Sequence, residues 1–137
     1  MLKLITKTIA AAVVVSVALF GSANAKTLKI ETHFTASSPN GEVAAQFAKN
    51  VEMFSGGSLK VQMFYSASVT GKSAEVFNSA QTGIIDCDMT GAGYQTGKNA
   101  AFQFAGDVMG GYDNPYQQYD FLKFPGAQDA VDALYKI

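Results

Sequence analysis

The chain has 137 residues, with ten lysines, no arginine, eleven acidic residues, one histidine and a formal net charge of −1. This length suits one small domain, and the near balance of charge without a basic run excludes nucleic acid as a favoured partner. The single cysteine, Cys87, excludes an internal disulfide.

Residues 1–25 have the three parts of a secretory signal peptide. Lys3 and Lys7 form a short basic start, residues 9–20 are apolar, and small residues end the segment. An apolar run of about 12 residues is shorter than the ~20 needed to cross a bilayer, which favours a cleaved signal over a membrane anchor. We expect cleavage after Ala25. The exported, soluble product keeps eight lysines and eleven acidic residues, so its net charge is −3.

The next part of the chain alternates between strand and helix patterns. Three segments are predicted as strands because apolar residues alternate or cluster in them: 28–34, 59–64 and 84–89. Ser38 and Pro39 open the first helix, which carries an apolar stripe as far as Phe54. A second, shorter helix is predicted over 73–82. The order β-α-β-α-β predicts an α/β fold with a parallel sheet.

The pattern loosens after residue 90. Residues 91–97 are predicted as a loop, 100–109 are apolar, and Asn114-Pro115 begins a helix. A last helix is predicted from residue 129, and it reaches residue 137 without a stop signal. We therefore expect the sequence to be the first part of a longer protein, with residues 26–137 forming one lobe.

Ligands bind beyond the carboxyl ends of the strands in an open parallel sheet. The loops that leave the three predicted strands therefore share one edge: 33–37, 65–70 and 90–96. They are rich in hydroxyl, amide and aromatic side chains and poor in paired carboxylates. Such an edge is suited to holding a small polar molecule rather than transforming it.

Two loops resemble nucleotide-binding motifs without matching them. Residues 66–73 end in Gly-Lys-Ser, but Ser66 stands where a phosphate-binding loop needs its first glycine. Residues 91–97 give G-x-G-x-x-x-G, one residue longer than the dinucleotide fingerprint, and they follow the third strand. We interpret these glycines as a tight exit from that strand, which places Tyr94.

Two further sets of residues have a chemical and a structural interpretation. Asp86 and Asp88 lie on one face of the third strand, and too few other oxygens accompany them for a metal site, so a solvated or capping role is favoured. Cys87 is favoured as a small buried hydrophobe. The alternative for Cys87 is a thiolate activated by His33, which requires the two side chains to meet in space.

Several segments resemble motifs of a known protein family and occur in the same order along the chain. They are the opening Leu28-Lys29-Ile30 with Ser38-Pro39-Asn40-Gly41, the helix and junction from Phe47-Ala48-Lys49 to Ser55-Gly56-Gly57-Ser58-Leu59-Lys60-Val61, the segment from Glu75-Val76-Phe77 to Gly83-Ile84-Ile85-Asp86, and the loop Gly93-Tyr94-Gln95-Thr96-Gly97-Lys98-Asn99-Ala100-Ala101-Phe102. With these residues the chain resembles the extracytoplasmic solute-binding subunit of tripartite ATP-independent periplasmic (TRAP) transporters. The match covers about residues 26–104.

This resemblance implies a two-lobed periplasmic protein that closes on a small organic acid, of the carboxylate or 2-oxo acid type, and delivers it to a TRAP membrane permease. It implies no enzymatic activity and no cofactor, and leaves the oligomeric state open. It places ligand-binding residues at Tyr94 and Gln95 in the Gly-Tyr loop, and at Phe34 and Thr70 at the ends of the first two strands. Gln95 stands where relatives often have an aromatic residue.

The missing arginine departs from the family pattern, because such proteins clamp the ligand carboxylate with an arginine from the second lobe. An unpaired buried carboxylate costs several kcal/mol, whereas micromolar binding is worth only about 8 kcal/mol. We expect the clamp to lie in a lobe beyond this sequence. Lys98 is the alternative cation, but it is favoured as a surface lysine. The alternative function is a secreted α/β enzyme that uses His33 as base or Cys87 as nucleophile at the same edge.

Overall fold

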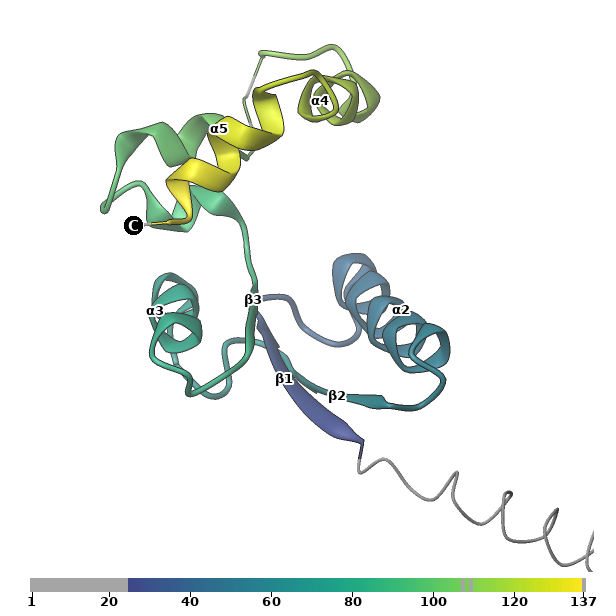
Figure 1. The fold of residues 1–137 in the computed structure, drawn as a ribbon. Coiled ribbons are helices and arrows are strands. Elements are labelled where there is room, and N and C mark those ends of the chain that lie inside the picture. The colour runs from purple at the N-terminus through teal and green to yellow at the C-terminus, as the bar shows by residue number, and fades with distance from the viewer. Residues whose placement is uncertain (1–24, 107, 109, 137) are drawn as a thin grey trace, which may run out of the picture.

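The computed structural model describes residues 25–106, 108 and 110–136. The predicted signal peptide, apart from its last residue, lies outside the described residues. The fold is α/β, as predicted, with a three-stranded sheet in the order β2-β1-β3. Figure 1 shows the sheet with a helix on either side and further helices beyond one end of the strands.

All strand pairs in the sheet are parallel. β1 (Lys26–Thr32) is the central strand, β2 (Leu59–Phe64) pairs along one edge, and β3 (Cys87–Met89) pairs with the end of β1. The carboxyl ends of the three strands therefore lie at the same edge. This confirms the parallel sheet that the alternating strand and helix patterns predict.

The third strand is shorter than the predicted range 84–89. The N–H groups of Ile84 and Ile85 donate to Ser79 O at the end of the preceding helix, at 2.9 and 3.3 Å, and not to a strand. Asp86 then joins β1, because its N–H donates to Lys29 O at 2.8 Å and its Oδ2 accepts from Lys29 N at 2.8 Å. The apolar residues Ile84 and Ile85 thus form a turn after the helix. An apolar run in the sequence does not by itself distinguish such a turn from a strand.

The helix α2 (Pro39–Phe54) covers one face of the sheet (Figure 1). Its start matches the prediction, since Ser38 Oγ accepts from Gly41 N at 3.1 Å and Pro39 occupies the first turn. Its small residues Gly41, Ala44 and Ala48 are buried. A helix with small residues on its inner face can approach a sheet closely, and the larger residues Val43 and Phe54 lie outward.

The other face of the sheet is covered by a short 3₁₀ turn, η1 (Ser73–Glu75), and by α3 (Val76–Gln81). Val76, Phe77 and Ile85 are buried there, and Val76 and Ile85 pack with Ala67 from the loop after β2. Val76 and Phe77 therefore lie on the inner side of α3.

The remaining helices lie beyond the carboxyl ends of the strands (Figure 1). They are η2 (Ala92–Gln95), η3 (Ala100–Phe104), α4 (Pro115–Leu122) and α5 (Ala127–Leu134). Phe102 is fully buried and packs edge-on against Phe77 and Tyr135, which joins these helices to α3. Within the described part of the chain, every helix is too short or too polar to cross a membrane.

Candidate functional site

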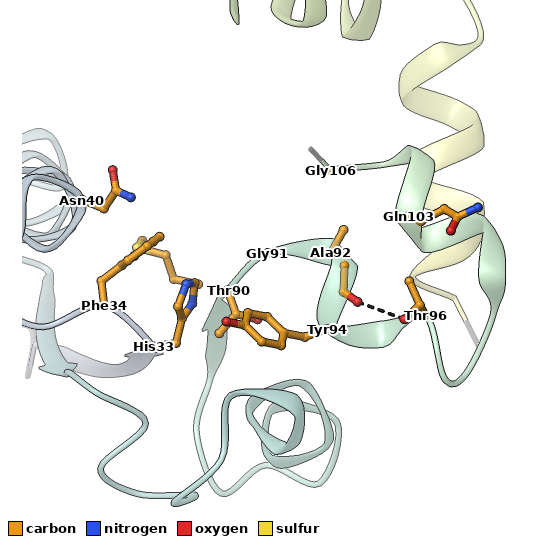
Figure 2. Close-up of a pocket in the computed structure, with 12 residues that line it drawn as sticks. His33, Phe34, Asn40, Thr90, Gly91, Ala92, Tyr94, Thr96, Gln103 and Gly106 are labelled. Carbon is orange, nitrogen blue, oxygen red and sulfur yellow. Dashed lines mark hydrogen bonds between the residues drawn. The ribbon is translucent and has the colours of Figure 1, made fainter. Parts of the chain in front are cut away.

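A cavity of about 810 Å³ opens at the carboxyl ends of β1 and β3. Figure 2 shows it between the loop after β1, the start of α2 and the segment that follows β3. The residues that line it are His33, Phe34, Asn40, Met89, Thr90, Gly91, Ala92, Gly93, Tyr94, Thr96, Gln103 and Gly106. Its position agrees with the edge of the sheet that the strand order predicts.

Three rings stand together on one wall of this cavity. The ring centroids of His33 and Phe34 are 3.9 Å apart, and those of His33 and Tyr94 are 5.1 Å apart in an edge-on arrangement. Figure 2 shows His33 between the other two rings. Aromatic pairs at such spacings hold one another in place. The wall therefore presents a fixed surface against which a planar ligand group can pack.

Polar groups from the segment after β3 and from α2 complete the lining. Gly91 leaves the strand and η2 follows at once, which brings Tyr94 back toward β1. Thr96 Oγ1 donates to Gly93 O at 3.1 Å and so closes this short turn. Asn40 on α2 and Gln103 on η3 add amide groups. Apart from His33, the described residues of the lining contain no side chain that can carry a positive charge.

The structure brings together two of the four residues predicted to bind the ligand. Phe34 and Tyr94 line the cavity. Thr70 is not in the lining: its N–H donates to Glu31 Oε1 at 3.3 Å and its hydroxyl donates to Lys72 O at 3.1 Å. Gln95 is only 2% exposed, and its Nε2 donates to Ala74 O at 3.4 Å. Ligand contact stays a prediction for all four residues.

Lys98 also lies away from the lining. Its Nζ donates to Gln81 Oε1 at 3.2 Å and stands 4.7 Å from the centroid of the Phe77 ring. Both contacts hold the ammonium group against α3. Lys98 is exposed, which agrees with its interpretation as a surface lysine and not as a substitute for an arginine.

Sequence reasoning missed four polar residues of the lining as ligand-binding residues: Asn40, Thr90, Thr96 and Gln103. Thr90 and Thr96 lie in the predicted edge loop 90–96, so the loop position was a usable signal for both. Gln103 lies beyond that loop, and its approach depends on how η3 folds back. His33 was singled out as a possible base, whereas the structure makes it part of the cavity wall.

An acidic pair with one fully buried member lies near the carboxyl ends of β1 and β3. Glu31 of β1 stands opposite Asp88 of β3 in the strand register, and Glu31 is fully buried. Glu31 Oε1 accepts from Val69 N at 2.6 Å and from Thr70 N. Burial raises the pKa of Asp88 above its ordinary value of 3.8. Thr90 and His33 oppose this rise, and Glu31 adds to it.

The cysteine–histidine pair of the enzyme alternative is not formed. Cys87 pairs with Ile30 in register, and successive residues of a strand point to opposite faces, so Cys87 and Asp88 face opposite sides. His33 instead lies close enough to Asp88 to lower the pKa of that carboxyl. Burial also raises the pKa of the Cys87 thiol, which disfavours the reactive thiolate. Among the described residues, no group of three or more His, Cys, Asp or Glu is placed to hold a metal ion.

A profile of one protein family matches residues 30–108, which is more than half of the chain. The family is described as bacterial extracellular solute-binding protein, family 7. The chain belongs to this family, and the resemblance to TRAP solute-binding subunits is confirmed. A comparison with curated proteins finds no match.

Solved structures of TRAP periplasmic solute-binding proteins share the fold. One from Rhodobacter sphaeroides, in an apo open form, is 23% identical with a TM-score of 0.74, and the match covers 80% of this chain and 35% of that one. One from Bordetella bronchiseptica RB50, with copurified calcium and picolinate, is 20% identical with a TM-score of 0.73 over 82% and 33% of the two chains. One from Pseudoalteromonas atlantica T6c, with bound sodium and pyruvate, is 18% identical with a TM-score of 0.74 over 82% and 34%. The chain thus spans about a third of the length of these proteins.

Proposed function

We propose that the full-length protein is a periplasmic solute-binding subunit that captures a small organic acid and delivers it to a TRAP membrane permease. The observation that carries the proposal is the cavity at the strand ends, in a chain that belongs to a solute-binding family. Cleavage after Ala25 and release into the periplasm are part of the same proposal.

The lining supports capture without chemical change. It combines aromatic surface from Phe34 and Tyr94 with amide and hydroxyl groups, which is the usual make-up of a site that orients a small ligand. The described lining contains no carboxylate side chain that could activate a nucleophile. A carboxylate or 2-oxo acid is the proposed class because two solved structures with the same fold contain picolinate or pyruvate.

The first lobe alone is expected to bind weakly. A ligand held on one wall loses its translational freedom but keeps much of its surface in water. The free energy gained from its contacts is then too small to offset the entropy lost on association. The chain matches only about a third of the length of the solved structures, and we propose that the remaining part supplies the second wall and the cationic clamp.

The test is the thermal unfolding of the full-length protein with pyruvate, picolinate and a panel of other small carboxylates. A ligand at 100 times its dissociation constant adds about 2.7 kcal/mol to the free energy of unfolding, so a true ligand raises Tm clearly. The amides of the same acids serve as controls for the carboxylate. No shift with any carboxylate would refute the proposal.

A matched pair of variants connects binding to this cavity. Tyr94→Ala removes a ring from the cavity wall, and Tyr116→Ala removes an exposed tyrosine of α4 that is outside the lining. We expect the first variant to lose most of the ligand-induced shift and the second to keep it. Equal shifts in the two variants would place the ligand elsewhere.

A further inference from the structure

The loop after β2, residues 65–70, is the part of the strand-end edge that the proposed function leaves without a role. Its position beyond a strand predicts direct contact with a ligand, at Thr70. In the structure, none of residues 65–70 belongs to the described lining of the cavity. The loop is nevertheless joined by hydrogen bonds to β1, the strand that leads to His33 and Phe34. Any effect of this loop on a ligand therefore acts through β1.

Two consecutive residues of the loop have a left-handed backbone. The angle φ is 59° at Ser66 and 49° at Ala67, and among the described residues other than glycine only these two have a positive φ. In this conformation the Cβ of an L-residue comes too close to the following carbonyl oxygen, so two such residues in succession are unusual. Strained backbone persists only where surrounding contacts enforce it. The Ser66–Ala67 turn is therefore a shape that its neighbours impose.

The contacts that impose this shape are made with the end of β1. Ser66 N donates to Phe34 O at 2.9 Å, and Ala67 N donates to Thr32 O at 3.0 Å. The left-handed backbone directs these two successive N–H groups toward the same segment of chain. The turn thus holds the peptide carbonyls on either side of His33.

The turn is itself fixed from the opposite side. Ala67 is buried and packs in one cluster with Val76 and Ile85. The next part of the loop is held by the fully buried Glu31, which accepts hydrogen bonds from two backbone N–H groups. The loop therefore connects the core under α3 to the backbone at the end of β1.

The backbone that the turn holds carries part of the cavity wall. His33 and Phe34 both line the cavity, and their ring centroids are 3.9 Å apart. The His33 ring also meets the Tyr94 ring edge-on (Figure 2). A shift of the Phe34 peptide would move its ring and disturb this contact of three rings.

We propose that Ser66 and Ala67 are positioning residues for the solute, because their strained turn fixes the His33–Phe34 part of the wall in the conformation that receives the ligand. This rests on the proposed function, since the ligand is the proposed organic acid. A wall that is already ordered loses little freedom on binding, which increases affinity. Neither residue needs to touch the ligand.

The single histidine reports the position of the wall without any ligand. In the full-length protein at a fixed pH, the neighbouring Phe34 ring shifts the NMR signals of the His33 ring protons. Ser66→Val puts a β-branched residue at a positive φ that it does not tolerate, and the exposed position of Ser66 means that no core packing changes. We expect the His33 ring signals to move clearly in this variant. Unmoved signals would overturn the positioning role.

Two variants are the controls for Ser66→Val. Ser66→Asn keeps a residue type that adopts the left-handed conformation. Ser68→Val places the same valine on an exposed residue of the same loop whose φ is not positive. Both should keep the wild-type His33 signals. Equal movement in Ser68→Val would mean that any valine in the loop has this effect, and would overturn the role of the turn.

The effect on the ligand is measured by calorimetric titration with pyruvate and with picolinate. Ser66→Val should bind roughly five- to tenfold more weakly, because the wall must then be ordered on binding. The two controls should stay within about twofold of the wild type. Wild-type affinity in Ser66→Val would overturn the proposal.

A measurement on the wild-type protein does not depend on the folding of any variant. Hydrogen exchange at the amides of Ser66 and Ala67 should slow when pyruvate or picolinate saturates the protein, although neither residue lines the cavity. Unchanged exchange at both amides would show that the turn and the ligand are not coupled.

The outcomes separate the two proposals. Saturable binding, together with wild-type His33 signals and wild-type affinity in Ser66→Val, refutes the positioning role and leaves the solute-binding function standing. Failure of every carboxylate to bind the wild-type protein refutes the function and the positioning of a solute that depends on it.

Discussion

Glu31 and Asp88 stand opposite each other in the register of two neighbouring parallel strands, with their side chains on the same side of the sheet. Both belong to the side covered by α3 and the loop after β2. A surface pair of this kind would be solvated, whereas here Glu31 is fully buried and Asp88 is partly buried. The pair lies directly below the cavity in the sheet, because the lining residues His33 and Thr90 come two residues after Glu31 and Asp88 respectively.

The first prediction concerns the loop that Glu31 holds. Glu31→Ala leaves the N–H groups of Val69 and Thr70 without their acceptor, and should lower the free energy of unfolding by about 2–4 kcal/mol. Glu31→Gln keeps an acceptor and removes the charge next to Asp88, so its stability should stay close to that of the wild type. Urea unfolding followed by circular dichroism measures both. Equal losses of stability in the two variants would mean that the negative charge of Glu31 holds the loop, and not its ability to accept hydrogen bonds from Val69 and Thr70.

The second prediction concerns the pH dependence of stability. Burial raises the pKa of Asp88 in the folded state above 3.8, so between the unfolded and the folded pKa the folded state binds more protons than the unfolded state. The contribution of Asp88 to stability is therefore full at low pH and is lost as pH rises through the folded pKa.

Asp88→Asn removes this dependence. Its stability relative to the wild type should increase as pH is raised from about 4 to about 7, as measured by urea unfolding at a series of pH values. Asp120→Asn, which changes an exposed carboxylate of α4, is the control and should follow the wild-type profile. A constant difference between Asp88→Asn and the wild type would show that Asp88 has the same pKa in both states.

Much of the fold follows from local signals. Ser38 and Pro39 mark the start of α2 because a capping side chain and a fixed φ act within one turn. The alternating pattern of residues 28–34 correctly indicates β1, whose two faces both pack in the fold. The edge at which the cavity forms follows from the parallel strand order. These features depend on neighbours in the sequence or on a general rule of topology.

Other features depend on packing that the sequence does not encode locally. In the predicted strand 28–34 the alternation places Lys29, Glu31 and His33 on one face, but it does not show that Glu31 is covered. Gln95 directly follows Tyr94 in η2, and the tight 3₁₀ turn directs one side chain outward and the next inward. A change of one residue in register therefore decides whether a predicted site residue reaches the cavity.

The inner face of α2 is a further case. The stripe of Val43, Phe47, Val51 and Phe54 has the spacing of a core face. Val51 is partly buried, yet Val43 is 69% exposed and Phe54 80% exposed. Val43 and Phe47 instead line a smaller apolar hollow of about 350 Å³ with Phe34 and other residues. Hydrophobic periodicity marks a helix correctly but does not specify which side faces the sheet when small residues permit a closer approach.

The third prediction tests that close approach at Gly41. A Cβ at this position would lie 2.0 Å from Thr35 O, in the loop that carries His33 and Phe34 to the cavity. Alanine normally stabilises a helix interior by up to about 1 kcal/mol relative to glycine. Gly41→Ala should nevertheless destabilise the protein, by about 2 kcal/mol or more, because backbone must move.

Gly97→Ala is the matched control for Gly41→Ala. Gly97 has an ordinary φ, and a Cβ there meets no atom within 4 Å. Its unfolding midpoint in urea should therefore change little. If Gly41→Ala were as stable as this control, α2 would lie further from the loop after β1 than in the structure.

The fourth prediction concerns the reactivity of Cys87, which distinguishes a solute-binding protein from a thiol enzyme. Burial raises the pKa of this thiol above 9.0, the charge of Asp86 adds to the rise, and Lys26 opposes it. The thiolate is the reactive form, so near pH 7 folded Cys87 should react with an aromatic disulfide reagent several-fold more slowly than the same chain in urea. A Ser68→Cys substitution in a Cys87→Ser background gives the rate of an accessible thiol in the folded protein, because Ser68 is exposed.

A His33→Phe variant tests the activated pair directly. Because Cys87 and Asp88 face opposite sides of the sheet, this variant should leave the reaction rate of Cys87 unchanged, whereas a thiol activated by His33 would lose its reactivity.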